Sequence, residues 1–282
     1  MIFRNSDGLL SIVFSSFLFG LTAIFIKMAT ATVSASEVLL FRALFGLLFI
    51  VGLVAVHKTT LWHKNNHLLF FRGVTGGIAV LLYFIAIAKI PISSAAILAN
   101  SYPLFATLFS FLLYRERPRL DTVIALLVAF TGTFIILDPS CAKVDLWHLS
   151  ALVSGILAGL SLTQIHELRK TDGSWAIVFS FLLGCLAFSA PLSLANFYIP
   201  NAYEWGLLII IGLLSTVGQG YYTSSFKHVS VSDGSTLALT DTAFTIFFSV
   251  LLLKETLTNN FVVGALLVFG GSIYLIARGQ KQ

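Results

Sequence analysis

Residues 98–116 read LANSYPLFATLFSFLLYRE, and residues 237–255 read LALTDTAFTIFFSVLLLKE. The two stretches are offset by 139 positions, since 237 − 98 = 139, and 8 of their 19 aligned residues are identical. Both are apolar enough for the interior of a bilayer, and both end in a basic residue followed by glutamate. The same offset pairs Gly20 with Gly159, far from these stretches. One offset that holds over distant parts of the chain indicates an internal duplication.

The composition places the chain in a membrane. Of its 282 residues, 57% are hydrophobic and 10% are charged, whereas soluble domains carry about 25% charged residues. The net charge of +5 is spread over short loops and forms no basic patch, so nucleic acid is not an expected partner. The expected surroundings are a lipid bilayer.

The hydropathy pattern predicts ten transmembrane helices, because a spanning helix needs about 20 apolar residues. The first is expected to be retained, since no clear small-residue cleavage site follows it. The predicted spans are residues 8–26, 37–55, 69–88, 93–113, 121–137, 147–165, 175–195, 205–223, 232–252 and 260–277.

The duplication divides the chain into two five-helix repeats, residues 1–140 and 141–282. Because five is odd, the second repeat must begin on the opposite side of the membrane, which makes the repeats inverted. The predicted fold is therefore an all-α polytopic membrane protein built from ten transmembrane helices as two inverted five-helix repeats. Many secondary transporters have this architecture, with a binding site near the midplane between the halves.

Lysine and arginine counts predict the orientation, because cytoplasmic loops are enriched in both. The side that holds the N-terminus and the loops after the even-numbered spans carries 12 of these residues, the other side carries 4, and Arg42 lies within the second span. Both termini are therefore expected to be cytoplasmic. The 12 are Arg4, Lys58, Lys64, Arg72, Arg115, Arg117, Arg119, Arg169, Lys170, Lys227, Arg278 and Lys281.

Several short motifs resemble a known family. They are FGLTAIFIK at residues 19–27, Phe41-Arg42, Tyr102-Pro103, and the glutamates that end the fourth and ninth spans, Glu116 and Glu255. Their order and repetition resemble the drug/metabolite transporter superfamily, in particular its ten-helix EamA-type members.

The resemblance implies a small-molecule transporter of the cytoplasmic (inner) membrane, with a central cavity built from spans 1, 3, 4, 6, 8 and 9. Many such members export amino acids or other metabolites, and relatives carry nucleotide sugars, nucleosides or vitamins. This sequence departs from the pattern at Thr242, where the family has proline, and at Ser180, where the second repeat lacks a counterpart of Arg42. These departures weaken any transfer of a substrate from relatives.

Asp241 is the acidic residue predicted deepest in a span. An ionised carboxylate at bilayer depth costs on the order of 2.5–3.5 kcal/mol by insertion scales. The offset aligns it with Tyr102, and Asn100 and Thr240 are expected nearby. Two interpretations stay open: a polar patch that binds substrate amines or hydroxyls and takes up a proton, or a structural aspartate bonded to neighbouring helices.

Other polar residues are weaker candidates. Gln164, Gln219 and Tyr222 lie in spans that the resemblance assigns to the cavity, as does Tyr83 in the third span. Tyrosines at helix ends are more often interfacial anchors than ligands, and this interpretation applies to both Tyr83 and Tyr222. Arg42 has two open interpretations as well. It either reaches the outer interface and pairs with Glu37, or acts as a gate or coupling residue and a contact for an anionic substrate group.

No enzyme is predicted, because the sequence has no HExxH, GxSxG or P-loop pattern. No cofactor is predicted, and the loop with His57, His63 and His67 has no cysteine or carboxylate to complete a metal site. The expected function is secondary transport of small organic metabolites, by export and alternating access, with H⁺ or a counter-substrate as coupling partner. The alternatives are a non-transporting scaffold or partner subunit, a channel, and an uptake or exchange carrier for a nucleotide- or vitamin-like metabolite. The sequence does not predict an oligomeric state.

Overall fold

The computed structural model describes residues 5–57, 65–115, 145–195, 197–229 and 231–279, together with a few residues between 120 and 135. This part of the chain is helical and contains no strand. The fifth predicted span, residues 121–137, lies largely outside the described residues, as do Glu116 and His63.

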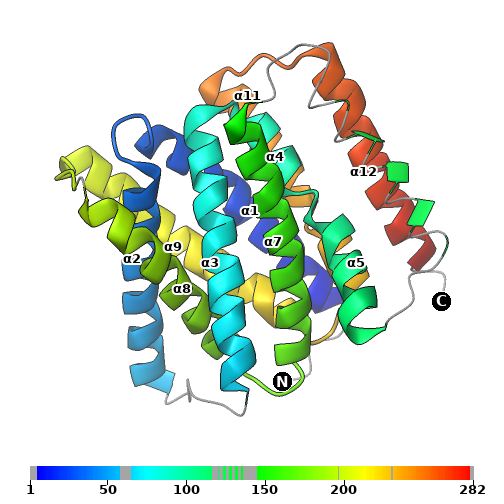
Figure 1. Ribbon diagram of the computed structural model, residues 1–282, viewed down its shortest axis with the longest axis horizontal. Coiled ribbons are helices and arrows are strands. Elements are labelled where there is room, and N and C mark those ends of the chain that lie inside the picture. Colours follow the sequence, from blue (N-terminus) through cyan, green and yellow to red (C-terminus); the bar gives the residue numbers. More distant parts are fainter. Residues whose placement is uncertain are drawn as a thin grey trace.

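The helices follow one another with short connections (Figure 1). Within the described residues, seven segments are long and apolar enough to cross a membrane, and α11 is a shorter apolar helix. The bounds are α1 Asn5–Ala29, α2 Ala35–His57, α3 Asn66–Lys89, α4 Ile92–Ala99, α5 Tyr102–Tyr114, α7 Leu146–Leu168, α8 Ser174–Leu194, α9 Ala202–Ser225, α10 Val231–Leu237, α11 Thr240–Leu253 and α12 Asn259–Gly279.

Two spans that were predicted as single helices are broken in the structure. The fourth consists of α4 and α5, with a break at Asn100 and Ser101, and the ninth consists of α10 and α11, with a break at Ala238 and Leu239. The breaks match through the sequence offset, since 239 − 100 = 139. Pro103 in the first turn of α5 accounts for the first break, because proline lacks a backbone donor. Backbone freed in this way at membrane depth is tolerated where protein or a cavity covers it.

Small residues bring the helices of the bundle close together. Helix α1 packs along α9 and α11, and α3 packs along α7 and α8. A side chain at Gly20 would place its Cβ 2.7 Å from the Cβ of Phe244 in α11. A side chain at Gly159 would place its Cβ 2.7 Å from the backbone nitrogen of Ala106 in α5. The repeated glycines therefore hold two equivalent helix contacts between the halves of the chain, where small residues allow close approach.

Three carboxylates join the two halves of the chain near the start of α2, the start of α9 and the end of α11, which lie toward the upper side of the bundle in Figure 1. Glu37 accepts a hydrogen bond of 2.7 Å from the backbone nitrogen of Tyr198. Glu204 accepts one of 2.5 Å from the Thr32 hydroxyl. Glu255 accepts one of 2.7 Å from the backbone nitrogen of Ile92, so its partner is the start of helix α4. We call these three residues the carboxylate latch.

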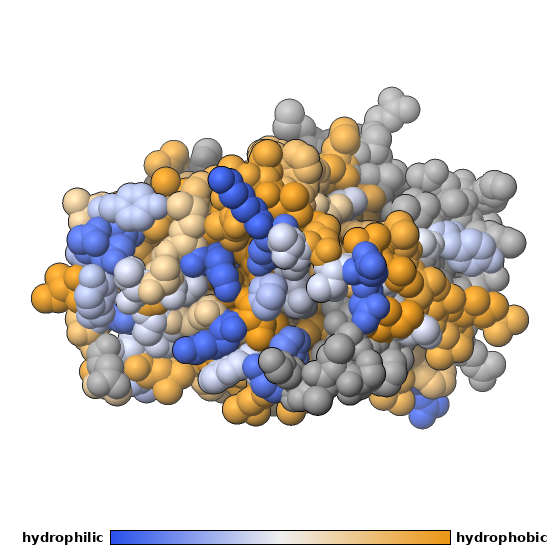
Figure 2. Space-filling view, turned by 90° about the horizontal axis from the view of Figure 1, so that it is seen from above, coloured by the Kyte–Doolittle hydropathy of each residue, from blue (hydrophilic) through white to orange (hydrophobic). Residues whose placement is uncertain are grey.

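The surface separates by polarity. Seen from above, hydrophilic side chains extend from the left side to the middle of the upper end, and hydrophobic ones lie among them and toward the right (Figure 2). On the flanks, large apolar side chains such as Leu48, Phe247 and Leu266 are at least 60% exposed. Apolar flanks with polar ends are the distribution expected of a bundle whose sides face lipid.

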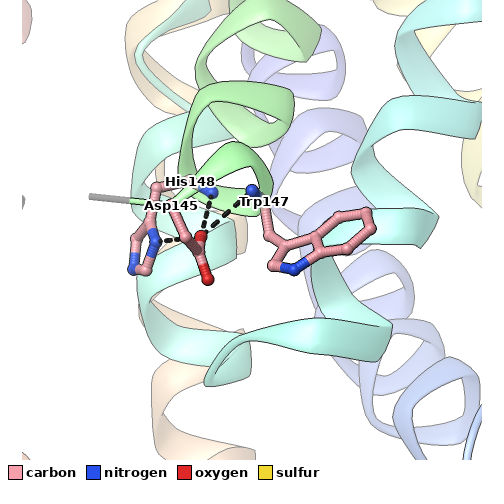
Figure 3. Close-up of polar contacts among 3 residues, drawn as sticks. All are labelled: Asp145, Trp147 and His148. Atoms are coloured by element: carbon pink, nitrogen blue, oxygen red, sulfur yellow. Dashed lines mark hydrogen bonds and ion pairs between the residues drawn. The ribbon is translucent and has the colours of Figure 1, made fainter. Parts of the chain in front are cut away.

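Helix α7 begins with a charged cap at this end (Figure 3). One carboxylate oxygen of Asp145 accepts hydrogen bonds from the backbone nitrogens of Trp147, at 3.0 Å, and His148, at 3.1 Å. The same oxygen lies 2.7 Å from Nδ1 of His148. Partial desolvation raises the pKa of Asp145, but the hydrogen bonds from the His148 side chain and the two backbone groups outweigh it, so the pKa lies below its ordinary value.

We expect Asp145→Ala to lower the melting temperature slightly at neutral pH, because the first turn of α7 loses its cap. A depressed pKa means that the carboxylate stabilises the fold above the ordinary value near 3.9 and loses this effect as the pH falls through the folded-state pKa. The difference from the native chain should therefore shrink in acid. Melting in detergent between pH 7 and pH 3 measures it, with Asp145→Asn as the control that keeps a capping acceptor. An unchanged melting temperature for the alanine variant at pH 7 would contradict the capping role.

Candidate substrate cavity

A cavity of about 190 Å³ lies inside the bundle. Its wall is formed by α1, α3, α7 and α9, by the two helix breaks, and by Arg42 of α2 and Phe181 of α8. Both halves of the chain contribute. These elements include every span that the family resemblance assigned to a central cavity.

Asp241 lies on the cavity wall at the start of α11. The amide nitrogen of Asn100, at the other break, donates to Thr242 Oγ1 at 2.7 Å and approaches Asp241 Oδ2 at 3.4 Å. The Thr245 hydroxyl donates to Asp241 Oδ1 at 3.3 Å. Both bonds to the carboxylate are longer than the usual 2.5–3.2 Å range, and no lysine or arginine of the described chain pairs with it. Asp241 thus keeps acceptor capacity toward the cavity.

Two tyrosines meet across the cavity. Tyr222 of α9 donates its hydroxyl proton to the Tyr102 hydroxyl of α5 at 3.3 Å, which links the second half to the first. Gln219, one turn before Tyr222, and Tyr83 of α3 also lie on the wall. Tyr83 is therefore a cavity residue in this structure and not an anchor at the membrane interface.

Two predicted site residues do not reach the cavity. The side-chain oxygen of Gln164 accepts a hydrogen bond of 2.8 Å from Thr75, so this side chain joins α7 to α3. The Thr240 hydroxyl donates 2.8 Å to the carbonyl of Leu237 and stabilises the break between α10 and α11. Their helices do border the cavity, but neither side chain is part of its wall.

Arg42 points into the bundle. It is 4% exposed, its Nε donates to Ser215 Oγ at 2.9 Å, and its guanidinium lies 5.3 Å from the centre of the Phe181 ring. Glu37 is occupied by Tyr198 and Ser34, so the suggested pairing of Arg42 with Glu37 does not occur. Arg42 is part of the cavity wall and does not reach toward the headgroups.

Arg72 is the cavity residue that the sequence analysis missed, because it was counted among the cytoplasmic loop cations. In the structure it lies in α3, is 4% exposed and lines the cavity. One terminal nitrogen donates to Ser161 Oγ at 2.6 Å, and the guanidinium lies 4.5 Å from the centre of the Phe181 ring. Its position inside the predicted span 69–88, four residues before Gly76, was the available signal.

Metal-binding groups are not clustered in the described part of the chain. It contains no group of three or more histidine, cysteine, aspartate or glutamate side chains suited to a metal ion. Cys185 is buried as a free thiol in α8, and Cys141 lies outside the described residues. The chemistry that this cavity offers is therefore non-covalent recognition by carboxylate, guanidinium, amide and phenol groups.

The chain is similar to membrane transporters both in its family match and among known proteins. The model of the EamA-like transporter family matches the chain twice, over residues 6–138 and 145–277. The pseudopaline exporter CntI of Pseudomonas aeruginosa (strain UCBPP-PA14) is 34% identical over 228 residues, which cover 80% of either chain. Solute carrier family 35 member G1 of Mus musculus is 26% identical over 97% of this chain and 80% of its own.

A riboflavin transporter of Brucella anthropi is more distant, at 23% identity over 76% of this chain and 77% of its own. Among solved structures, one crystal structure of a protein matches 99% of this chain and 100% of its own with a TM-score of 0.74. At 20% identity, that match shows a shared fold and no more.

Proposed function

Because the chain belongs to the EamA-like transporter family, within the drug/metabolite transporter superfamily, and is thus a membrane transporter and not an enzyme, we propose that it exports small organic metabolites. The substrates would be amino acids or related solutes, the route would cross the cytoplasmic membrane, and the mechanism would be alternating access.

One observation carries the proposal. The cavity is walled by both halves of the chain, and residues at the two matching helix breaks, Asn100 and Asp241, face it. Broken helices at corresponding positions of two repeats are typical of secondary transporters, whose substrate and ion sites lie at such breaks. A scaffold protein gains nothing from a midplane carboxylate of this kind, since its burial is costly.

The ten-helix inverted arrangement belongs to the same proposal. The two family matches begin 139 residues apart, since 145 − 6 = 139, and this equals the offset of the sequence repeat. This agreement supports two repeats, residues 1–140 and 141–282. The excess of lysine and arginine on one side supports cytoplasmic termini.

The size of the substrate and the direction of transport are each supported by a different observation. The cavity of about 190 Å³ is smaller than the roughly 300–1,000 Å³ of sites for drug-sized ligands, which favours a solute of amino-acid size. A relative that covers 80% of this chain is named an exporter, which favours outward transport. Asp241 is the group that we assign to proton uptake or to exchange with a counter-substrate.

The test is solute movement by the purified chain in liposomes. Metabolite profiling of cells that over-express the chain first identifies solutes whose distribution between cells and medium changes. Each such solute is then assayed in liposomes for saturation and for counterflow against unlabelled solute. Saturable flux with counterflow is the expected result. Unsaturable flux would indicate a channel, and no flux of any solute would contradict transport by this chain.

A further inference from the structure

Two buried arginines share one side of the cavity. Arg42 and Arg72 are each 4% exposed, both line the cavity, and both guanidinium groups lie over the ring of Phe181. Their guanidinium carbons lie 5.3 Å and 4.5 Å from the centre of that ring, so the two like charges are neighbours in the cavity. In the part of the chain that the structure describes, no aspartate or glutamate lies within 4.0 Å of either group.

The protein uses only some of the hydrogen-bond donors of these two guanidinium groups. A guanidinium has five N–H donors, and within the described residues each arginine makes one hydrogen bond to a serine hydroxyl. The Nε of Arg72 is buried without a partner. An uncompensated buried charge is costly. The contacts with the Phe181 ring, and of Arg42 also with the Phe84 ring at 5.6 Å, recover only part of this cost. Two like charges held together this way are suited to a ligand that brings the opposite charge.

The packing around Arg72 leaves room for this group. A side chain at Gly76 would place its Cβ 1.8 Å from a terminal nitrogen of Arg72 and 2.9 Å from the Phe181 ring. Glycine at this position thus lets the guanidinium lie against α3 and face the cavity. The Ser161 hydroxyl holds it from the opposite helix, α7.

We propose that Arg42 and Arg72 form an oxyanion-binding subsite, and that the transported solute places a carboxylate or phosphate group there. The inference rests on the proposed transport function and specifies its substrate class. The cavity wall holds two guanidinium groups and one carboxylate, Asp241, so its formal charge is 2 − 1 = +1. A solute with two carboxylates and one amine neutralises all three groups, with its amine toward Asp241.

The small cavity favours carboxylates over nucleotide phosphates as the source of the anion. Arg72, Tyr222 and Asp241 all line the same cavity of about 190 Å³, so one small solute can face its cationic and its acidic groups together. Planar carboxylates also match the fork of an arginine in two parallel hydrogen bonds.

The test measures binding to the purified full-length chain in detergent, through its melting temperature at constant ionic strength. The probes are L-glutamate, its amide L-glutamine, putrescine and inorganic phosphate. We expect L-glutamate to stabilise the native chain at lower concentrations than L-glutamine, and putrescine to have no stabilising effect. In Arg72→Gln, the L-glutamate concentration for half-maximal stabilisation should rise about tenfold or more, the scale of losing a charged hydrogen bond.

The control is Lys227→Gln, which removes one cation from an exposed position outside the cavity and should leave all four responses unchanged. Arg72→Lys keeps the charge without the fork, so it should fall between the native chain and Arg72→Gln, and it serves as the test if the glutamine variant does not fold. Stabilisation by phosphate alone would support the subsite and assign it to phosphate esters. No stabilisation by any anion, or equal stabilisation in the native chain and Arg72→Gln, would overturn the inference.

These binding measurements do not depend on solute flux, so the transport proposal and the anion-subsite proposal can be contradicted independently of each other. A chain that binds anions through Arg72 but moves no solute would contradict the transport proposal alone. A chain whose transported solutes carry no anionic group would contradict the anion subsite and leave transport in place.

Discussion

Asp241→Asn is expected to lower the transport rate at least about tenfold while the chain still folds. Asparagine keeps the shape of the side chain and can still bond to Asn100 and Thr245, which are the present partners of Asp241. It removes the charge, and a hydrogen bond to a charged group contributes about 1.5–3 kcal/mol, where each 1.4 kcal/mol is a factor of ten. The measurement is the movement of the identified solute by equal amounts of both proteins.

A matched control is Glu167→Gln, which neutralises a partly exposed carboxylate paired with Lys170 outside the cavity. Its transport rate should equal that of the native chain. Net transport and exchange should also respond differently if Asp241 carries a proton. The variant would then lose accumulation driven by a pH gradient but keep some exchange of labelled for unlabelled solute. Native rates for Asp241→Asn in both assays would reduce Asp241 to a structural residue.

Gly184→Ala is expected to destabilise the chain by about 3 kcal/mol, at the upper end of what overpacking costs. A Cβ at this position would lie 1.9 Å from the carbonyl oxygen of Gly73, which is backbone and not a movable side chain. Helices α3 and α8 would have to separate where they pack together. Phe181 is three residues earlier on α8, so its ring would also shift beneath both cavity arginines.

The measurement is the melting temperature in detergent, compared with Gly52→Ala. No atom lies within 4 Å of a Cβ at Gly52, so this replacement should be neutral or slightly stabilising, because alanine is about 0.5–1 kcal/mol better than glycine inside a helix. A Gly184→Ala chain as stable as the Gly52→Ala chain would show that the contact between α3 and α8 can expand freely.

The sequence predicted a bundle of apolar helices, which the described residues confirm, but not the helix breaks. The offset of 139 pairs Gly20 with Gly159, and at both positions a neighbouring helix lies too close for a side chain. Pro103 signals the break between α4 and α5. The matching break before α11 has Thr242 in place of proline, so no residue near it in the sequence predicts a break. This break is stabilised by tertiary packing and by the hydrogen bond from Asn100 to Thr242.

Only some residues of the candidate site could be identified from the chemistry of their side chains alone. Asp241 was one of them, because a carboxylate deep in an apolar span is energetically costly and therefore indicates a specific role. Gln164 was assigned to the cavity by its helix, but the face of a helix that meets the cavity depends on how the bundle packs, and this side chain points to Thr75. Arg72 was missed because charge counting treats a cation near the end of a span as part of the loop.

In the proposed transport cycle, the carboxylate latch would resist opening of one end of the bundle. If access alternates, the upper end must open, and Glu37, Glu204 and Glu255 must then exchange their partners in the other half for water. A hydrogen bond to a charged group contributes about 1.5–3 kcal/mol, so the three together hold the two halves by roughly 4.5–9 kcal/mol. Opening this end then requires that contacts formed elsewhere, with the solute or at the opposite end, return a comparable free energy.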